Sequence, residues 1–283
     1  MKLVRFGELG REKPGLLMPD GVLMDVSEQV ADYNENFFAM GGMRVLQGFV
    51  EEGCPGAQAV NIPVRLGPPV YRPSKIVCAG LNYRSHSEEF SHDQPKEPAL
   101  FLKAPSSLSG PDDVILAPPG SRKLDYEVEL AIVMARKASS VDELEAVDCI
   151  AGYTLMCDVS EREWQIERGG QWTKGKSYDT FAPLGPCLVT PDEIPPVDRI
   201  QLWLNVNGKQ RQRDMAFSMI WSVPQLVSYA SQFMTLMPGD VLSTGTPAGV
   251  ALGMDGDGYL QLGDLVEMGC DPIGVQTHRV RAR

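Results

Sequence analysis

The chain has 283 residues, of which 43% are hydrophobic and 22% charged, so it can bury a sizeable core and is not a largely disordered protein. Its net charge of −11 argues against nucleic acid or an anionic membrane as the main partner, because both are themselves negatively charged. No apolar run approaches the roughly 18 residues that a membrane span needs, and the first ten residues lack the apolar core of a signal peptide.

The first seventy residues predict a small N-terminal domain. Two apolar segments flank the turn residues 19–21, Pro-Asp-Gly, which predicts a β-hairpin. Apolar residues at helical spacing then predict a short helix over 42–52. Four prolines between residues 62 and 75 predict a linker. We therefore expect a small domain over residues 1–70 and the main domain over residues 71–283.

The larger domain is dominated by strand patterns. Apolar or alternating runs predict strands over 76–79, 100–103, 114–116 and 125–134, and a hairpin of 202–206 and 209–211 around Asn207 and Gly208. Shorter patterns predict helices over 141–147, 160–168 and 222–235, the last with Ser222 as its cap. Because the strands do not alternate regularly with helices, the sequence predicts an α+β, mostly β fold.

Three acids, Asp125, Glu127 and Glu129, alternate in the predicted strand DYEVEL. Residues two apart in a strand project from the same face, so three carboxylates should lie side by side. Their repulsion destabilises the strand unless a divalent cation binds them, and Mg²⁺ and Mn²⁺ prefer such oxygen ligands. The alternative is an edge strand whose acids face water.

A further acid, Asp158, ends the apolar segment GYTLMCD. A lone acid at this position is often only a helix cap. Together with Glu127 and Glu129, however, it completes a three-carboxylate metal site with open positions for a substrate.

The chain has three histidines, His86, His92 and His278. His86 precedes Glu89 by three residues, so in a helical turn the two side chains can form a hydrogen bond that orients the imidazole as a general base. The alternative is a surface histidine beside acids. We expect His92 in a solvated loop and His278 at the surface of a strand.

Residues 170–177, GQWTKGKS, fit the phosphate-binding pattern GxxxxGK[ST]. The preceding residues are polar and helix-like, and Pro183 and Pro186 follow, so the strand and helix that this motif needs are missing. Lys176 is then either a surface lysine or an ammonium group aimed at a developing enolate or carboxylate oxygen. Backbone amides of the loop around Gly245 can bind a carboxylate, or the loop is only a tight turn.

The six cysteines are scattered without a CxxC pair. This pattern is typical of free thiols in a reducing compartment, so we expect a cytoplasmic protein without structural zinc.

Seven motifs follow one another between about residues 80 and 250: GLNYRSHSEEF, FLKAPSSLSG, LDYEVELAIVM, GYTLMCDVSERE, KGKSYDTFAPLGP, NVNGKQRQ and VLSTGTPAGV. In this order they resemble the fumarylacetoacetate hydrolase family. The resemblance implies a β-roll catalytic domain that forms a homodimer and holds Mg²⁺ or Mn²⁺. It also implies residue roles: Glu127, Glu129 and Asp158 as metal ligands, His86 and Glu89 as the catalytic pair, Lys176 as the active-site lysine, and Thr246 with Gly245 at the substrate carboxylate.

The chemistry implied by the resemblance is hydrolysis of a carbon–carbon bond in a 2,4-dioxo acid, which releases pyruvate. The stretch ERGGQWTKGKSYDTF is similar to bacterial members that act on 2,4-diketo-3-deoxy sugar acids, and acylpyruvates are the other substrate class. The same metal site also serves oxaloacetate decarboxylases, 2-hydroxy-dienoate isomerases and ureidoglycolate lyases. A non-enzymatic, metal-binding dimer with a degenerate site is the alternative from another class.

Overall fold

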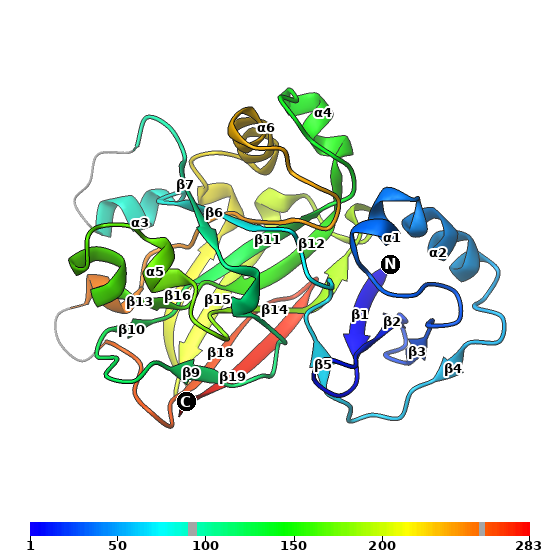
Figure 1. Cartoon of the computed structure of the whole chain (residues 1–283), viewed down its shortest axis with the longest axis horizontal. Helices are drawn as coiled ribbons and strands as arrows, with labels where there is room; N and C mark the ends of the chain where they lie inside the picture. The colour runs from blue at the N-terminus through cyan, green and yellow to red at the C-terminus, as the bar shows by residue number, and fades with distance from the viewer. Residues whose placement is uncertain (90–94, 255–257) are drawn as a thin grey trace.

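The computed structural model describes residues 1–89, 95–254 and 258–283. Its main feature is a twelve-stranded, mostly antiparallel sheet that runs from the N-terminal region into the centre of the molecule (Figure 1). The main path follows the order β4 (Gln58–Ala59), β3 (Leu23–Asp25), β2 (Lys13–Leu17), β1 (Lys2–Phe6), β14 (Ala182–Val189), β12 (Ile150–Cys157), β11 (Val128–Met134), β17 (Val241–Ser243), β6 (Ile76–Gly80) and β7 (Ala99–Lys103). Two further strands pair beside this path, β5 (Leu66–Gly67) with β1 and β8 (Leu108–Ser109) with β14.

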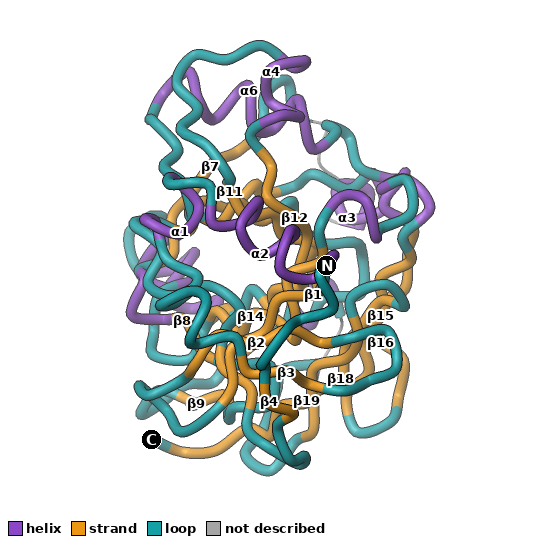
Figure 2. Tube along the Cα trace, turned by 90° about the vertical axis from the view of Figure 1, so that its right-hand side faces the viewer, coloured by secondary structure: helices purple, strands orange, loops and turns teal. Residues whose placement is uncertain are grey.

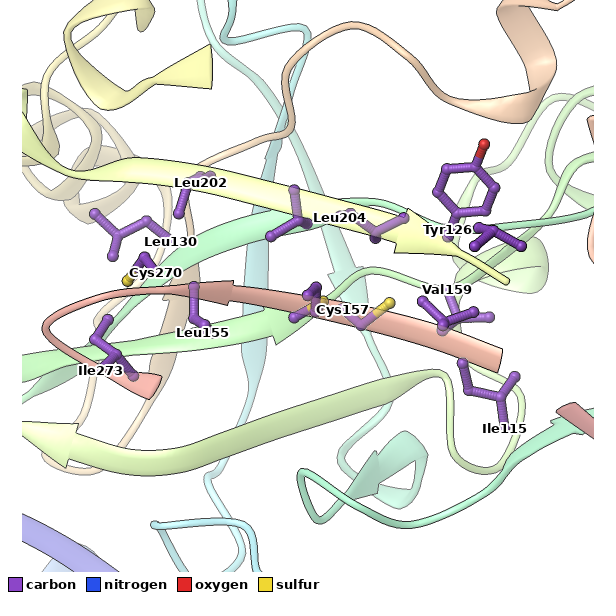
Figure 3. Packing of buried hydrophobic residues seen from close by; sticks show 14 of the residues in the cluster. Ile115, Tyr126, Leu130, Leu155, Cys157, Val159, Leu202, Leu204, Cys270 and Ile273 are labelled. Atoms are coloured by element: carbon purple, nitrogen blue, oxygen red, sulfur yellow. The ribbon is translucent and has the colours of Figure 1, made fainter. Parts of the chain in front are cut away.

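A five-stranded sheet packs against the middle of the large one. Its order is β16 (Lys209–Met215), β15 (Gln201–Val206), β18 (Leu265–Cys270), β19 (Gly274–Ala282) and β9 (Ile115–Ala117). Figure 3 shows Leu130 and Leu155 of the large sheet beside Leu202 and Leu204 of the smaller one, all of them buried. Each such leucine contributes about 1.5–3 kcal/mol through burial, so this interface is the main core. The predicted α+β, mostly β class is confirmed.

Helices lie at the periphery of the sheets. In Figure 2, α6 (Val223–Phe233) and α4 (Glu143–Asp148) lie together at the top, and α1 (Glu35–Ala39) and α2 (Gly42–Glu51) lie near the N-terminal strands. Two short helices, α3 (Arg84–Glu89) and α5 (Thr173–Lys176), lie on the left of Figure 1. Ser222 caps α6 as predicted, in a capping box with Gln225. Among the described residues, no helix is both long and apolar enough to cross a membrane.

The large sheet is continuous across the predicted linker. Residues 66–67 of the proline-rich segment form β5, which pairs with β1, and β1 in turn pairs with β14. The N-terminal hairpin of β2 and β3 and the helix α2 are confirmed. The division at residue 70 stays a prediction.

Three local predictions are wrong. The predicted strand 125–134 is interrupted: β10 (Leu124–Asp125) pairs with β13 (Ser160–Glu161), whereas β11 pairs with β12. The predicted helix 160–168 is β13 followed by a π-helix, Glu163–Glu167. His278 is fully buried rather than at the surface, because its face of β19 also carries Gln276 and packs inward. His92 lies outside the described residues.

The buried side chain of Gln212 forms hydrogen bonds around the interruption between β10 and β11. Gln212 of β16 accepts a hydrogen bond from the backbone N–H of Val128 at 2.9 Å. Its amide donates to the Thr246 hydroxyl and to the Pro247 carbonyl, both at 2.8 Å. The Thr246 hydroxyl in turn donates to the Val128 carbonyl at 2.9 Å. Gln212 therefore links the small sheet to the start of β11 and to the loop that follows β17.

We expect Gln212→Met to lower the free energy of unfolding by about 2–4 kcal/mol, because three buried hydrogen bonds are lost and their partners stay buried. Urea unfolding followed by circular dichroism measures this change. Gln210→Met is the matched control, since Gln210 is exposed on the same strand and its replacement should change stability by less than about 0.5 kcal/mol. Equal losses in the two variants would contradict the role given to Gln212.

Candidate metal and catalytic site

Three carboxylates meet where β11 and β12 pair. Val128 lies opposite Cys157, and the backbone N–H of Asp158 donates to the Glu127 carbonyl at 2.9 Å, so the register brings Asp158 beside Glu127 and Glu129. One oxygen from each of the three lies within 4.8 Å of the others. All three residues are buried: Glu129 lies on β11, Glu127 directly precedes β11 and Asp158 directly follows β12, and both strands have neighbours on both sides. The alternative of a solvated edge strand is therefore wrong.

Two of these carboxylates are held by cationic side chains. The Lys176 ammonium lies 2.5 Å from Glu127 Oε2 and 2.7 Å from Asp158 Oδ2. Arg162 donates to Glu127 Oε1 at 2.6 Å, and Lys103 forms an ion pair with Asp158. Burial opposes ionisation of Glu127, but the charges of Arg162 and Lys176 hold the pKa of its carboxyl well below the usual range.

Glu129 is in a different electrostatic environment. It accepts hydrogen bonds from the Ser243 hydroxyl at 2.5 Å and from the Gly245 N–H at 3.2 Å, and both donors are neutral. Burial, and then the negative charges of Asp158 and Glu127, raise the pKa of the Glu129 carboxyl well above its usual value. Within the described part of the chain, Glu129 forms no ion pair with a cationic side chain. Three carboxylate ligands fit a hard divalent cation such as Mg²⁺ or Mn²⁺, since the negative charge of Glu129 is not balanced by a cationic side chain of the described residues.

Asp125 does not join the three carboxylates, although it shares the motif DYEVEL with Glu127 and Glu129. Its carboxylate accepts from Arg162 Nε at 2.8 Å and from the backbone N–H groups of Ala251 and Leu252 at 2.8 and 3.1 Å. Arg162 also donates to the Gln165 side chain at 2.8 Å. Asp125 therefore orients the guanidinium that contacts Glu127, rather than offering a ligand itself.

His86 and Glu89 form the predicted pair within α3. His86 Nδ1 lies 3.2 Å from Glu89 Oε2, and the other carboxylate oxygen of Glu89 accepts from the Gly249 N–H at 3.0 Å. The i, i+3 spacing on one helical turn produces this contact. Glu89 is thus fixed at both oxygens and orients the imidazole.

A cavity of about 150 Å³ brings these groups together. Its polar lining comprises His86, Glu127, Glu129, Asp158, Arg162, Gln165, Lys176 and Thr246, and its remaining lining comprises Ala79, Gly80, Leu81, Phe101, Ile166, Trp172 and Leu252. Lys176 is buried rather than at the surface. The Gly245 N–H donates to Glu129, and the φ of +93° at Gly245 is a left-handed conformation that favours glycine. Whether Gly245 and Thr246 contact a substrate carboxylate stays a prediction.

The GxxxxGK[ST] match does not form a phosphate-binding loop, as predicted. A π-helix precedes it, its second half is the four-residue α5, and the strand β14 follows. Two cations of the site, Lys103 and Arg162, carry no sequence signal beyond their place inside the motifs FLKAPSSLSG and GYTLMCDVSERE. A lysine that ends an apolar strand, as Lys103 does, is the feature that could have drawn attention to it.

Comparisons with known proteins agree with this geometry. Residues 75–281 match the family described as "Fumarylacetoacetate (FAA) hydrolase C-terminal". A relative from Burkholderia multivorans, named as a hydrolase with no substrate given, is 45% identical over 283 residues, which are 100% of this chain and 99% of the relative.

Two solved structures resemble the whole chain. Maleylpyruvate hydrolase from Sphingobium sp. SYK-6, in complex with manganese(II) and pyruvate, matches with a TM-score of 0.82 and 28% identity, over 100% of this chain and 99% of that one. A 5-carboxymethyl-2-hydroxymuconate delta-isomerase from Mycobacterium smegmatis matches with a TM-score of 0.78 and 31% identity, over the same shares of the two chains. The comparisons confirm the resemblance seen in the sequence and its fold, and they include both a hydrolase and an isomerase.

We expect Glu129→Gln to abolish stabilisation by Mn²⁺, because it replaces an anionic ligand with a neutral amide. The stability of the metal-free protein should stay unchanged or rise, since a buried carboxyl group, whose ionised form is unfavourable beside two other carboxylates, is removed. Thermal unfolding with and without Mn²⁺ measures both effects, and a metal concentration of about 100 times Kd should add about 2.7 kcal/mol to the parent protein.

Glu161→Gln is the control for this prediction. Glu161 is also buried, and its carboxylate contacts neutral donors, the Ser121 hydroxyl and the Glu163 N–H. This variant should keep the gain from Mn²⁺. If Glu129→Gln gains as much from Mn²⁺ as the parent does, Glu129 is not a metal ligand.

Proposed function

The chain belongs to the fumarylacetoacetate hydrolase family, and we propose from this premise that it is a metal-dependent hydrolase that cleaves a carbon–carbon bond in a 2,4-dioxo acid. The substrate would be an acylpyruvate or a 2,4-diketo-3-deoxy sugar acid, and one product is pyruvate. One observation carries the proposal: three buried carboxylates and His86, whose imidazole contacts Glu89, line the same cavity. The likeness to a hydrolase solved with manganese(II) and pyruvate supports it.

The residues fit a metal ion, which Glu127, Glu129 and Asp158 would hold. Mg²⁺ or Mn²⁺ would supply a Lewis acid that polarises the oxygens of a 2-keto acid. Glu129 lies on β11, and Glu127 and Asp158 lie directly beside the ends of β11 and β12, so the pairing of these two strands keeps the three side chains together. This placement agrees with the preference of both metals for carboxylate ligands.

The remaining steps fall to side chains of this protein. His86, oriented by Glu89, takes a proton from water as the water oxygen attacks the C4 carbonyl. The C3–C4 bond then breaks, and its electron pair forms the enolate of pyruvate while C4 leaves as a carboxylic acid. The Lys176 ammonium stabilises the enolate oxygen, and burial beside Phe101 strengthens this interaction. Protonation at C3 gives pyruvate.

Burial opposes the positive charge on Lys176, yet Asp158 and Glu127 raise the pKa of its ammonium above the usual value. Lys176 is therefore protonated at neutral pH and can act as an electrostatic group, not as a base. This leaves the His86–Glu89 pair as the base of the proposed mechanism.

Other reactions use the same kind of site. A 2-hydroxy-dienoate isomerase is the strongest of these alternatives, because a structural neighbour has an isomerase name. An oxaloacetate decarboxylase and a ureidoglycolate lyase are the others, and a non-enzymatic metal-binding dimer is the alternative outside enzymes.

The resemblance to the family also supports a homodimer, which light scattering in solution would test.

A substrate panel tests the proposal. We expect pyruvate and an equimolar carboxylic acid from acylpyruvates or 2,4-diketo-3-deoxy sugar acids, and loss of this activity with EDTA that added Mn²⁺ restores. Carbon dioxide with pyruvate from oxaloacetate would indicate the decarboxylase, and a spectral shift of a 2-hydroxy-dienoate without cleavage would indicate the isomerase. No turnover of any 2-keto acid in the presence of Mn²⁺ would contradict an enzyme of this kind.

We expect His86→Ala to lower kcat by about two to four powers of ten, because the general base is lost. Its Mn²⁺ affinity, measured by calorimetry, should stay close to that of the parent, since His86 is not among the three ligands. Glu89→Gln should lose less activity, because it weakens the orientation of the imidazole but keeps the ring. Loss of Mn²⁺ binding in His86→Ala would show that His86 acts on the metal instead.

A further inference from the structure

We propose that the cavity takes an uncharged, apolar substituent on C4 of the substrate and discriminates against a second carboxylate there. The inference rests on the proposed function, since it concerns the group that a 2,4-dioxo acid carries beyond its pyruvate unit. Among 2,4-dioxo acids, the inference favours acylpyruvates with a short hydrocarbon chain over acids that carry a carboxylate at both ends. Four side chains of the lining carry it, Phe101, Ile166, Trp172 and Leu252, which we call the apolar wall.

The apolar wall begins beside the catalytic groups. The Lys176 ammonium lies 5.0 Å from the centre of the Phe101 ring, and the Trp172 ring packs edge-on against Phe101 with 5.4 Å between centroids. The Trp172 indole also lies against the backbone of β6, where a Cβ on Gly80 would come within 2.6 Å of it. A substrate whose C2 oxygen and C3 carbon lie near Lys176 therefore meets hydrocarbon surface at its far end.

Cationic groups of the described lining already have anionic partners. Lys176 contacts Glu127 and Asp158, and Arg162 contacts Asp125 and Glu127. The His86 imidazole, which the proposed mechanism uses as a base, contacts Glu89. A carboxylate placed against the apolar wall would lose its hydration without gaining a counter-ion from the described lining, and this desolvation is unfavourable. An alkyl group at the same position would instead gain from burial.

Two 2-keto acids of equal length isolate this difference. 2-Oxohexanoate and 2-oxoadipate have the same six-carbon chain and differ only in a terminal carboxylate, and neither has the 4-keto group that cleavage requires. Calorimetry in the presence of Mn²⁺ gives their Kd values without turnover. We expect 2-oxohexanoate to bind at least about tenfold more tightly.

Ile166→Lys should weaken or remove the preference. Ile166 lies on the π-helix and its side chain is 48% exposed, so a lysine there can reach solvent and still offer its charge to the cavity. The ratio of the two Kd values should shift toward 2-oxoadipate by about tenfold or more. Leu144→Lys is the matched control, because it adds the same charge at an exposed leucine of α4, outside the cavity lining, and should leave the ratio unchanged.

Several outcomes would overturn the inference. Binding of 2-oxoadipate as tight as that of 2-oxohexanoate would show that a second carboxylate is accepted, while the proposed hydrolase activity could still stand on the substrate panel. An unchanged ratio in Ile166→Lys, or an equal shift in Leu144→Lys, would show that the apolar wall does not select the substituent. Failure of both acids to bind with Mn²⁺ present would overturn the inference and the proposed function together.

Discussion

The structure depends on burying three carboxylates side by side. Glu127, Glu129 and Asp158 have lost nearly all contact with water, and their oxygens lie within 4.8 Å of one another. Such an arrangement is unfavourable unless opposite charge is brought to it. The chain supplies this charge from three separate segments: Lys103 at the end of β7, Arg162 after β13, and Lys176 in α5. The packing of these segments around β11 and β12 is thus an electrostatic requirement as well as a hydrophobic one.

The negative charges of the three carboxylates are not balanced equally by the protein. Cationic side chains contact Glu127 and Asp158, whereas the contacts of Glu129 are the Ser243 hydroxyl and the Gly245 N–H. Neutral donors stabilise a carboxylate less than a cation does. The cations hold the pKa of Glu127 low against burial, whereas burial and the charges of Asp158 and Glu127 raise the pKa of Glu129. A divalent cation would supply the missing charge at the one acid whose described contacts leave it least compensated.

Sequence reasoning succeeds where the contact is local and fails where it depends on tertiary packing. The His86–Glu89 contact follows from a three-residue spacing, and the strands follow from apolar runs. The meeting of Glu127 with Asp158 needs a strand register, which the sequence does not give; the residue types and the motif resemblance indicated the site without it. Nothing local shows that Lys103 or Arg162 turns inward, because a buried cation is recognisable only beside its partners. The predicted surface position of His278 is wrong for the same reason: its imidazole contacts the Gln276 side chain and the Asp113 carbonyl, and Asp113 lies on a distant segment.

One segment links charge compensation to the shape of the cavity. Residues 162–176 provide Arg162 and Lys176, which neutralise the acids, and also Ile166 and Trp172 of the apolar wall. The segment folds tightly on itself, since a Cβ on Gly175 would lie 2.6 Å from the backbone N of Gln165 and from the Glu161 carbonyl oxygen. A backbone shift in this segment therefore moves both sets of groups. For this reason a change in specificity is more easily made through an exposed side chain such as Ile166 than through the backbone, because the ion pairs to Glu127 and Asp158 then stay in place.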